Sequence, residues 1–150
     1  MLFLTTLFYC SSTRMLTVNT YLAPSSIHGV GLFAAELIPA NSIIWQDNEH
    51  IDTIYSEGFF LNICRNAHKN TLQHLLNCSC KRGGRYFYLT DNAQFMNHSE
   101  TLDNFVHGAS KSRVSAFHQI LKGDELICNY LSCNDPDDFH VRNIKKHIIE

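Results

Sequence analysis

The sequence is poor in the features that mark membrane, nucleic-acid-binding and disordered proteins. It has no run of 18 apolar residues, so no membrane span is expected. Its 12 Lys and Arg stand against 14 Asp and Glu, and the net charge of −2 offers no basic excess for nucleic acid or acidic lipid. Repeats and low-complexity linkers are also missing. The 45% hydrophobic content excludes a disordered chain, and 150 residues fit one domain.

The apolar N-terminus lacks the usual marks of a secretory signal. Residues 1–10 are almost all apolar, but no cation precedes Arg14 and no small residues precede Cys10. We therefore expect residues 1–14 to be an extension, with the domain beginning near Met15. A weak export signal is the alternative interpretation.

The six cysteines allow two interpretations. A disulfide-stapled fold is one, and reduced thiols in an intracellular, cytoplasmic protein are the other. A chain of this length does not need staples, which favours reduced thiols. Cys78-Ser79-Cys80 is a lone C-x-C pair and not the ligand set of a structural zinc site, so we predict no metal.

Short alternating segments dominate the expected secondary structure. Helices are expected at 71–78 and 141–149, and residues 91–99 as a loop or short helix packed inward. Strands are expected at 16–22, 42–46, 51–55, 86–90, 113–121 and 125–130, with turns at 24–26, 39–42, 81–85 and 122–124. Many short strands and little helix predict a mostly β fold in one unit.

A first motif contains two glycines, Gly29 and Gly31. With Ala34 they match the dinucleotide-binding pattern G-x-G-x-x-A, and Glu49 or Asp52 even follows at about the expected 20 residues. However, Pro39 comes five residues after Ala34, which leaves no room for the crossover helix of a Rossmann unit. The glycines instead indicate a close backbone approach or a positive φ, and a bulge or tight bend is the structural alternative.

Two further motifs place polar groups beside apolar ones. Residues 95–99, FMNHS, put an amide, an imidazole and a hydroxyl directly after two large apolar side chains. Residues 120–130, ILKGDELICNY, look like strand, glycine turn and strand ending in tyrosine. Each motif alone is compatible with a satisfied polar turn or with ordinary amphipathic packing.

Taken in this order, the three motifs resemble the SET domain family of S-adenosylmethionine-dependent protein lysine methyltransferases. The resemblance covers residues 16–131. It implies a β-clip-like fold of small curved sheets with few short helices, in which a C-terminal pseudoknot joins the second and third motifs. The domain would span residues 15–131, and residues 132–150 would form a tail or helix covering the cofactor site.

The resemblance also implies roles for individual residues. Gly29, Gly31 and Asn97 would lie against the methionine part of S-adenosylmethionine, and the backbone of His98 against its adenine. Tyr130 would place its hydroxyl at the mouth of a channel that admits a lysine from a protein substrate. The channel wall would include Tyr88 and Phe95.

The sequence departs from the family after the second motif. Glu100 replaces a frequent cysteine, Asn104 falls one residue late, and only Cys133 follows Tyr130, so no zinc-binding post-SET segment is expected. Phe139 and His140 are candidates to cover the adenine in its place. An inactive SET-like binding or scaffold module, and a methyltransferase with another acceptor, are the alternatives.

Acidic residues in the tail also allow two interpretations. Asp135, Asp137 and Asp138, together with Glu100, would favour a basic substrate segment. The alternative, which we favour, is an ordinary solvated surface.

Overall fold

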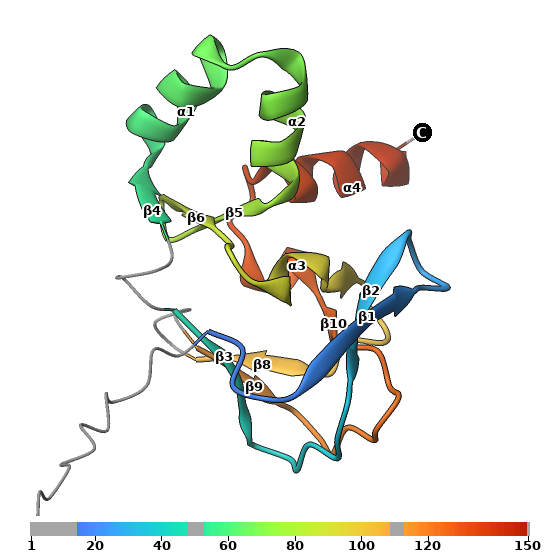
Figure 1. Ribbon diagram of the computed structural model, residues 1–150. Coiled ribbons are helices and arrows are strands. Elements are labelled where there is room, and N and C mark those ends of the chain that lie inside the picture. Colours follow the sequence, from blue (N-terminus) through green and yellow to red (C-terminus); the bar gives the residue numbers. More distant parts are fainter. Residues whose placement is uncertain (1–14, 48–52, 109–112, 150) are drawn as a thin grey trace, which may run out of the picture.

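The computed structural model describes residues 15–47, 53–108 and 113–149. Expectations about residues 1–14, Glu49 and Asp52 lie outside these ranges. Within them the chain forms four small sheets and a few short helices (Figure 1), which confirms the expected fold class.

The sheets fall into two groups. The first holds the antiparallel hairpin β1 (Thr20–Pro24) and β2 (Val30–Ala34), and the sheet β3–β9–β8 (Ile43–Gln46, Arg113–Ala116, Phe105–His107). The second is the sheet β4–β6–β5 (Thr53–Ser56, Arg85–Tyr88, Ser79–Arg82). A fourth, parallel pair joins β7 (Asn97–His98) to β10 (Ile127–Cys128) and lies between the two groups.

Helices surround the second group of strands. α1 (Glu57–Asn66) and α2 (Lys69–Asn77) follow β4, and α4 (Phe139–Ile149) lies beside α2 and β5 (Figure 1). The short α3 (Tyr130–Cys133) and the 3₁₀ turn η1 (Asn92–Phe95) occupy the centre. The helices expected near 71–78 and 141–149 and the inward-packed turn at 91–99 are confirmed, whereas α1 was not expected.

The main core lies between the first group of strands and η1. Fourteen buried residues form it, among them Leu32, Ile44, Trp45, Ala116 and Leu126, each at most 2% exposed. Burial of this apolar area supplies most of the favourable free energy that holds the small sheets together, because no sheet in the described part of the chain exceeds three strands.

Several expected strand limits were wrong. The first strand begins at Thr20 and not at residue 16, because Leu16 makes only an isolated bridge to Trp45. The strand expected at 113–121 ends at Ala116. Lys81 and Arg82 belong to β5, and the turn of this hairpin is the pair Gly83–Gly84 alone, with φ of +58° and +75°.

Candidate active site

The second and third motifs meet where β7 pairs with β10. Asn97 lies opposite Ile127, and His98 opposite Cys128. On the other side, Asn104 Nδ2 donates to the Glu125 carbonyl at 2.8 Å, and Ile127 N donates to Asn104 Oδ1 at 3.0 Å. The third motif is thus held between β7 and Asn104, whose one-residue displacement in the sequence does not prevent this contact.

The glycine motif is tied to the same place through Glu125. Asn97 Nδ2 donates to Glu125 Oε1 at 2.8 Å and to the His28 carbonyl at 3.0 Å, and Ser25 Oγ donates to Glu125 Oε2 at 2.9 Å. A Cβ on Gly31 would overlap Glu125 Oε1. The fold itself therefore needs a residue without a side chain at position 31, whether or not a cofactor also needs it.

Gly29 is a glycine for a different reason. Its φ is +50°, a conformation that residues with a Cβ rarely adopt, and nothing lies within 4 Å of the place a Cβ would take. The loop between β1 and β2 thus turns at Gly29 beside open space, next to the contacts of Asn97.

The sequence suggested that Tyr130 ends a strand, but Tyr130 is the first residue of α3. Asn129 ends the extended segment because its Oδ1 accepts the Leu131 N–H at 3.0 Å, which caps the helix. Tyr130 N donates to His98 Nδ1 at 3.0 Å, and the Tyr130 hydroxyl donates to the Met96 carbonyl at 2.5 Å. Both contacts fix the phenol against the second motif.

Burial keeps the Tyr130 phenol protonated. Desolvation raises the pKa of Tyr130 well above its ordinary value, because the charged phenolate is disfavoured away from water. At neutral pH the hydroxyl is therefore a hydrogen-bond donor, and it is not a base.

A row of aromatic rings extends from the second motif into the tail. The ring centroids of His98 and Tyr130 are 5.2 Å apart, those of Tyr130 and His140 5.5 Å, and those of His140 and Phe139 5.4 Å. His140 Nε2 also lies 3.0 Å from the Leu76 carbonyl of α2. The tail thus contacts Tyr130 through the ring of His140.

A cavity of about 50 Å³ lies beside Tyr130. Among the described residues, its wall includes aromatic and apolar side chains, three cysteines and amides, with Arg82 and His140 as the basic members and no Asp or Glu. The lining residues are Trp45, Asn77, Cys78, Ser79, Cys80, Arg82, Leu89, Ala93, Gln94, Met96, Phe105, Val114, Cys128, Tyr130, Asn134 and His140. The cavity can therefore take an uncharged or apolar group more readily than a cation.

Tyr88 and Phe95, which the sequence led us to expect in a channel wall, make contacts away from this cavity. The Tyr88 hydroxyl is 2.9 Å from His74 Nε2 of α2, and Phe95 packs against the main core. Neither is among the residues around the cavity. Trp45, Cys80 and Arg82 do line it, and the sequence analysis assigned none of them to the active site.

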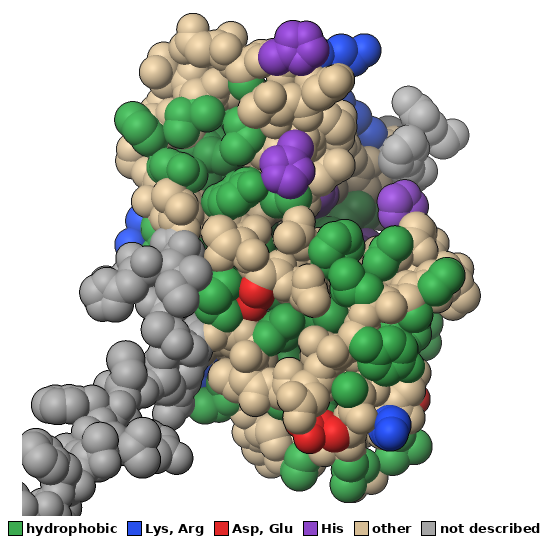
Figure 2. Space-filling model, in the orientation of Figure 1, with side chains coloured by type: hydrophobic (Ala, Val, Ile, Leu, Met, Phe, Trp, Pro, Cys, Tyr) green, Lys and Arg blue, Asp and Glu red, His purple; other side chains and the backbone are tan. Residues whose placement is uncertain are grey.

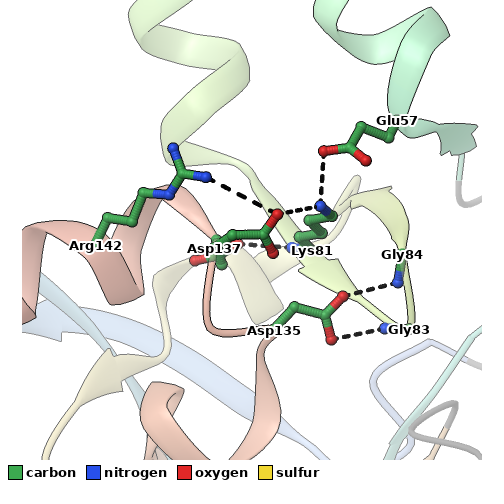
Figure 3. A network of polar contacts seen from close by, with 8 residues as sticks. Glu57, Lys81, Gly83, Gly84, Asp135, Asp137 and Arg142 are labelled. Carbon is green, nitrogen blue, oxygen red and sulfur yellow. Dashed lines mark hydrogen bonds and ion pairs between the residues drawn. The ribbon is translucent and has the colours of Figure 1, made fainter.

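The tail is attached to the β5–β6 hairpin by a polar network, here named the hairpin clamp, between residues 81–84 and 134–138 (Figure 3). Asp135 Oδ1 and Oδ2 accept the N–H groups of Gly83 and Gly84 at 2.9 and 2.7 Å. Lys81 Nζ lies 2.7 Å from Glu57 Oε1 and 2.5 Å from Asp137 Oδ2. The Asp135 and Asp137 contacts hold the tail against the β5–β6 hairpin.

A second layer of the clamp is buried. Asp138 is 1% exposed, and its carboxylate accepts the N–H groups of Lys81 at 2.7 Å and of His140 at 2.9 Å. Arg82 Nε donates to Asn134 Oδ1 at 3.2 Å. The interpretation of the acidic tail residues as a solvated surface was therefore wrong for Asp138, whose buried carboxylate accepts hydrogen bonds from backbone amides.

The surface shows no strong charge of one sign on the face seen in Figure 2, where Lys, Arg, Asp and Glu are few and scattered. Within the described ranges no helix is long and apolar enough to cross a membrane. In the same part of the chain, no group of three or more His, Cys, Asp or Glu is placed to hold a metal ion, and this includes the Cys78–Cys80 segment.

Comparison with known proteins gives one family and a set of similar structures. The family model described as SET domain matches residues 29–131. No curated protein matches the sequence. Among solved structures, one similar chain is Chaetomium thermophilum PRC2 in an autoinhibited conformation bound to S-adenosylmethionine, with a TM-score of 0.58 and 17% identity. That match covers 87% of this chain and 17% of the other.

Two further structures of the same assembly are also similar. An apo form with two substitutions in Ezh2 gives a TM-score of 0.59 at 19% identity, covering 85% of this chain and 16% of that one. A humanized mutant of the Polycomb Repressive Complex 2 bound to the inhibitor GSK126 gives 0.55 at 19%, covering 78% and 15%. The chain thus spans less than a fifth of these proteins, and identities this low establish the fold alone.

Proposed function

The chain belongs to the SET domain family, and on that premise we propose that it is a protein-lysine N-methyltransferase that uses S-adenosylmethionine. One observation carries the proposal: the Tyr130 hydroxyl is fixed between the second and third motifs, at the wall of a cavity without a carboxylate among its described lining residues. An arrangement of this kind suits a neutral amine that must be aligned, because the described lining residues include no carboxylate that would pair with an ammonium.

The residues present fit the proposed cofactor. The open space at Gly29 lies next to Asn97, and the neighbouring rings of His98, Tyr130 and His140 offer aromatic contacts to a planar base. Aromatic faces also attract a sulfonium, as they attract other cations. We assign Gly29, Gly31 and Asn97 to the methionine end of the cofactor, and His98 with Phe139 and His140 to its adenine. When bound, the cofactor supplies an electrophilic methyl group.

The cavity would receive the side chain of the acceptor lysine. A free lysine amine has a pKa of about 10.4, and removing its proton at pH 7 costs about 4 to 5 kcal/mol. A site that excludes water disfavours the ammonium and can lower such a pKa by roughly 3 to 5 units. Trp45, Phe105 and Met96 give the cavity this apolar character.

Tyr130 would orient the amine and would not remove its proton. The phenol is protonated because burial raises its pKa. The backbone N–H of Tyr130 donates to His98, and its hydroxyl donates to the Met96 carbonyl, so both are held by the second motif. A group held in this way contributes by fixing the approach of nitrogen to the methyl group, which is the kind of effect that positioning supplies.

The test is transfer of labelled methyl from S-adenosylmethionine into a protein extract. We expect incorporation by the wild-type protein and a fall of roughly a hundredfold in Tyr130→Phe, on the scale seen when one oriented hydrogen-bonding group is removed from an active site. Tyr21→Phe is the matched control, since Tyr21 is 42% exposed on β1 and stacks on Phe33. Equal transfer by the wild type and Tyr130→Phe contradicts the role of Tyr130. No transfer by a wild type that binds the cofactor identifies a binding module.

A further inference from the structure

Arg82 is a buried cation at the wall of the cavity that contains Tyr130. It is 9% exposed, and its Nε donates to Asn134 Oδ1 at 3.2 Å. The guanidinium carbon lies 6.0 Å from the centre of the Trp45 ring, which lines the same cavity. Burying a cation costs free energy unless a partner compensates for the lost water, so the position of Arg82 needs a reason.

No carboxylate forms an ion pair with Arg82 among the described residues. Lys81, its neighbour in β5, points to the opposite face and pairs with Glu57 and Asp137. Asp138 is the acid whose charge acts on Arg82, and it does not line the cavity. The described residues around the cavity include Arg82 and no carboxylate, so the cavity side of Arg82 faces no negative charge.

The other titratable groups around Arg82 add no negative charge near neutral pH. Burial raises the pKa of Cys80 to about 11, and the hydrogen bond with Cys133 together with burial raises the pKa of Cys128. The Tyr130 phenol is likewise protonated. Burial also raises the pKa of Cys78, whose thiol therefore adds no negative charge, and His140 of α4 has no acidic group.

We propose that Arg82 keeps the acceptor lysine neutral, because its fixed positive charge disfavours a second cation inside the cavity. The inference rests on the proposed function and assigns to this chain its own means of preparing the nucleophile. The lysine ammonium first releases its proton to solvent. The lone pair of the neutral amine then forms the N–CH₃ bond as the S–CH₃ bond breaks, the electron pair stays on sulfur as a thioether, and the methylated nitrogen takes the positive charge.

The effect of Arg82 on the acceptor can be measured as a pH dependence. Two unit charges about 8 to 10 Å apart, at the effective dielectric constant of about 20 found in proteins, shift a pKa by roughly one unit. We therefore expect Arg82→Gln to move the acidic limb of the kcat–pH profile to higher pH by about one unit. At pH 7 the variant would be about tenfold slower than the wild type, and the difference would disappear as the pH rises.

The experiment measures kcat against pH with the acceptor protein that carries the label in the assay above. Arg82→Gln keeps a donor for Asn134 without the charge, and Arg82→Lys keeps the charge. Arg85→Gln, at an exposed position of the same hairpin, removes an equal charge away from the cavity. Arg82→Lys and Arg85→Gln are expected to keep the wild-type limb. Arg82→Met is the second neutral variant, should Arg82→Gln prove unfolded by circular dichroism.

The possible outcomes separate the two proposals. A limb that moves only in the neutral Arg82 variants supports the role of its charge. A rate that falls by the same factor at every pH, or a limb that does not move, overturns it and leaves Arg82 as a structural anchor of Asn134. With an acceptor whose lysine is replaced by the less basic γ-thia analogue, the acidic limb of the wild-type kcat profile must move to lower pH. A limb that stays at the same pH with this acceptor also overturns the inference. A wild type without transfer refutes the proposed function itself.

Discussion

The carboxylate of Asp138 is predicted to be the strongest single contact of the hairpin clamp. It sits at the N-cap of α4, where Oδ1 accepts the N–H groups of His140 and Val141, and Oδ2 accepts the Lys81 N–H across the clamp. Removal of an N-cap side chain costs about 1 kcal/mol. A buried N–H left without its acceptor costs roughly 1 to 3 kcal/mol more. Asp138→Ala should therefore lower the free energy of unfolding by about 3 kcal/mol.

The assay is thermal unfolding followed by circular dichroism. For a domain of this size about 1 kcal/mol corresponds to roughly 2 to 4 °C in Tm, so we expect Tm to fall by about 6 to 12 °C. Asp138→Asn should lose roughly half as much, because its amide oxygen keeps one of the two sets of contacts. Asp124→Asn is the matched control, since Asp124 is exposed and its single turn contact with Leu121 N can be kept by an amide.

Hydrogen exchange distinguishes a local from a global effect. The amides of His140 and Val141 should exchange faster in Asp138→Ala than in Asp124→Asn, whereas those of the β1–β2 hairpin should change only with global stability. A Tm within about 3 °C of the wild type, together with unchanged protection of α4, would refute the reasoning that the buried carboxylate holds the tail.

Two further predictions concern the glycine motif and the surface part of the clamp. Gly31→Ala should destabilise the protein, because the new Cβ overlaps Glu125 Oε1. The same substitution should destabilise a Glu125→Ala protein much less, which a double-mutant cycle followed by thermal unfolding measures. Equal destabilisation in both backgrounds would contradict this explanation. The Lys81 ammonium lowers the pKa of Asp137 below its ordinary value of 3.8, so this pair stabilises the fold above that pH and the contribution is lost as the pH falls through the lowered pKa. Lys81→Met should therefore flatten the acid limb of Tm against pH, and an unchanged limb would contradict the assignment.

The sequence allowed the family and the contacts between motifs to be predicted, because short-range chemistry determines them. Two glycines flanked by prolines excluded a crossover helix, and the three motifs then agreed with one fold. The turn expected at 39–42 contains Asn41, whose φ of +64° is one that asparagine tolerates better than most residues. The extra residue before Asn104 looked like a disturbance, yet the side chain still reaches the third motif.

Other features could not be predicted, because they depend on partners distant in the sequence. Tyr130 was expected at the end of a strand, although the cap residue Asn129 before it was a signal for a helix start. The role of Asp138 required knowledge that the Lys81 N–H lies beside it, 57 residues away. Arg82 looked like part of a basic turn, and only the pairing of β5 with β6 turns it toward the cavity.

The long sequence separation of the clamp contacts also has a consequence for the order of folding. The β5–β6 hairpin closes through a two-residue turn, whereas Asp135 meets Gly83 and Gly84 across 52 and 51 residues. Contacts of long separation carry a larger loop-closure cost and form after local ones. Tyr130 lies between β10 and the clamp, so a partly folded chain with its hairpins formed would still have an incomplete cavity. The cavity of this site is therefore complete only after the tail has docked on the hairpin.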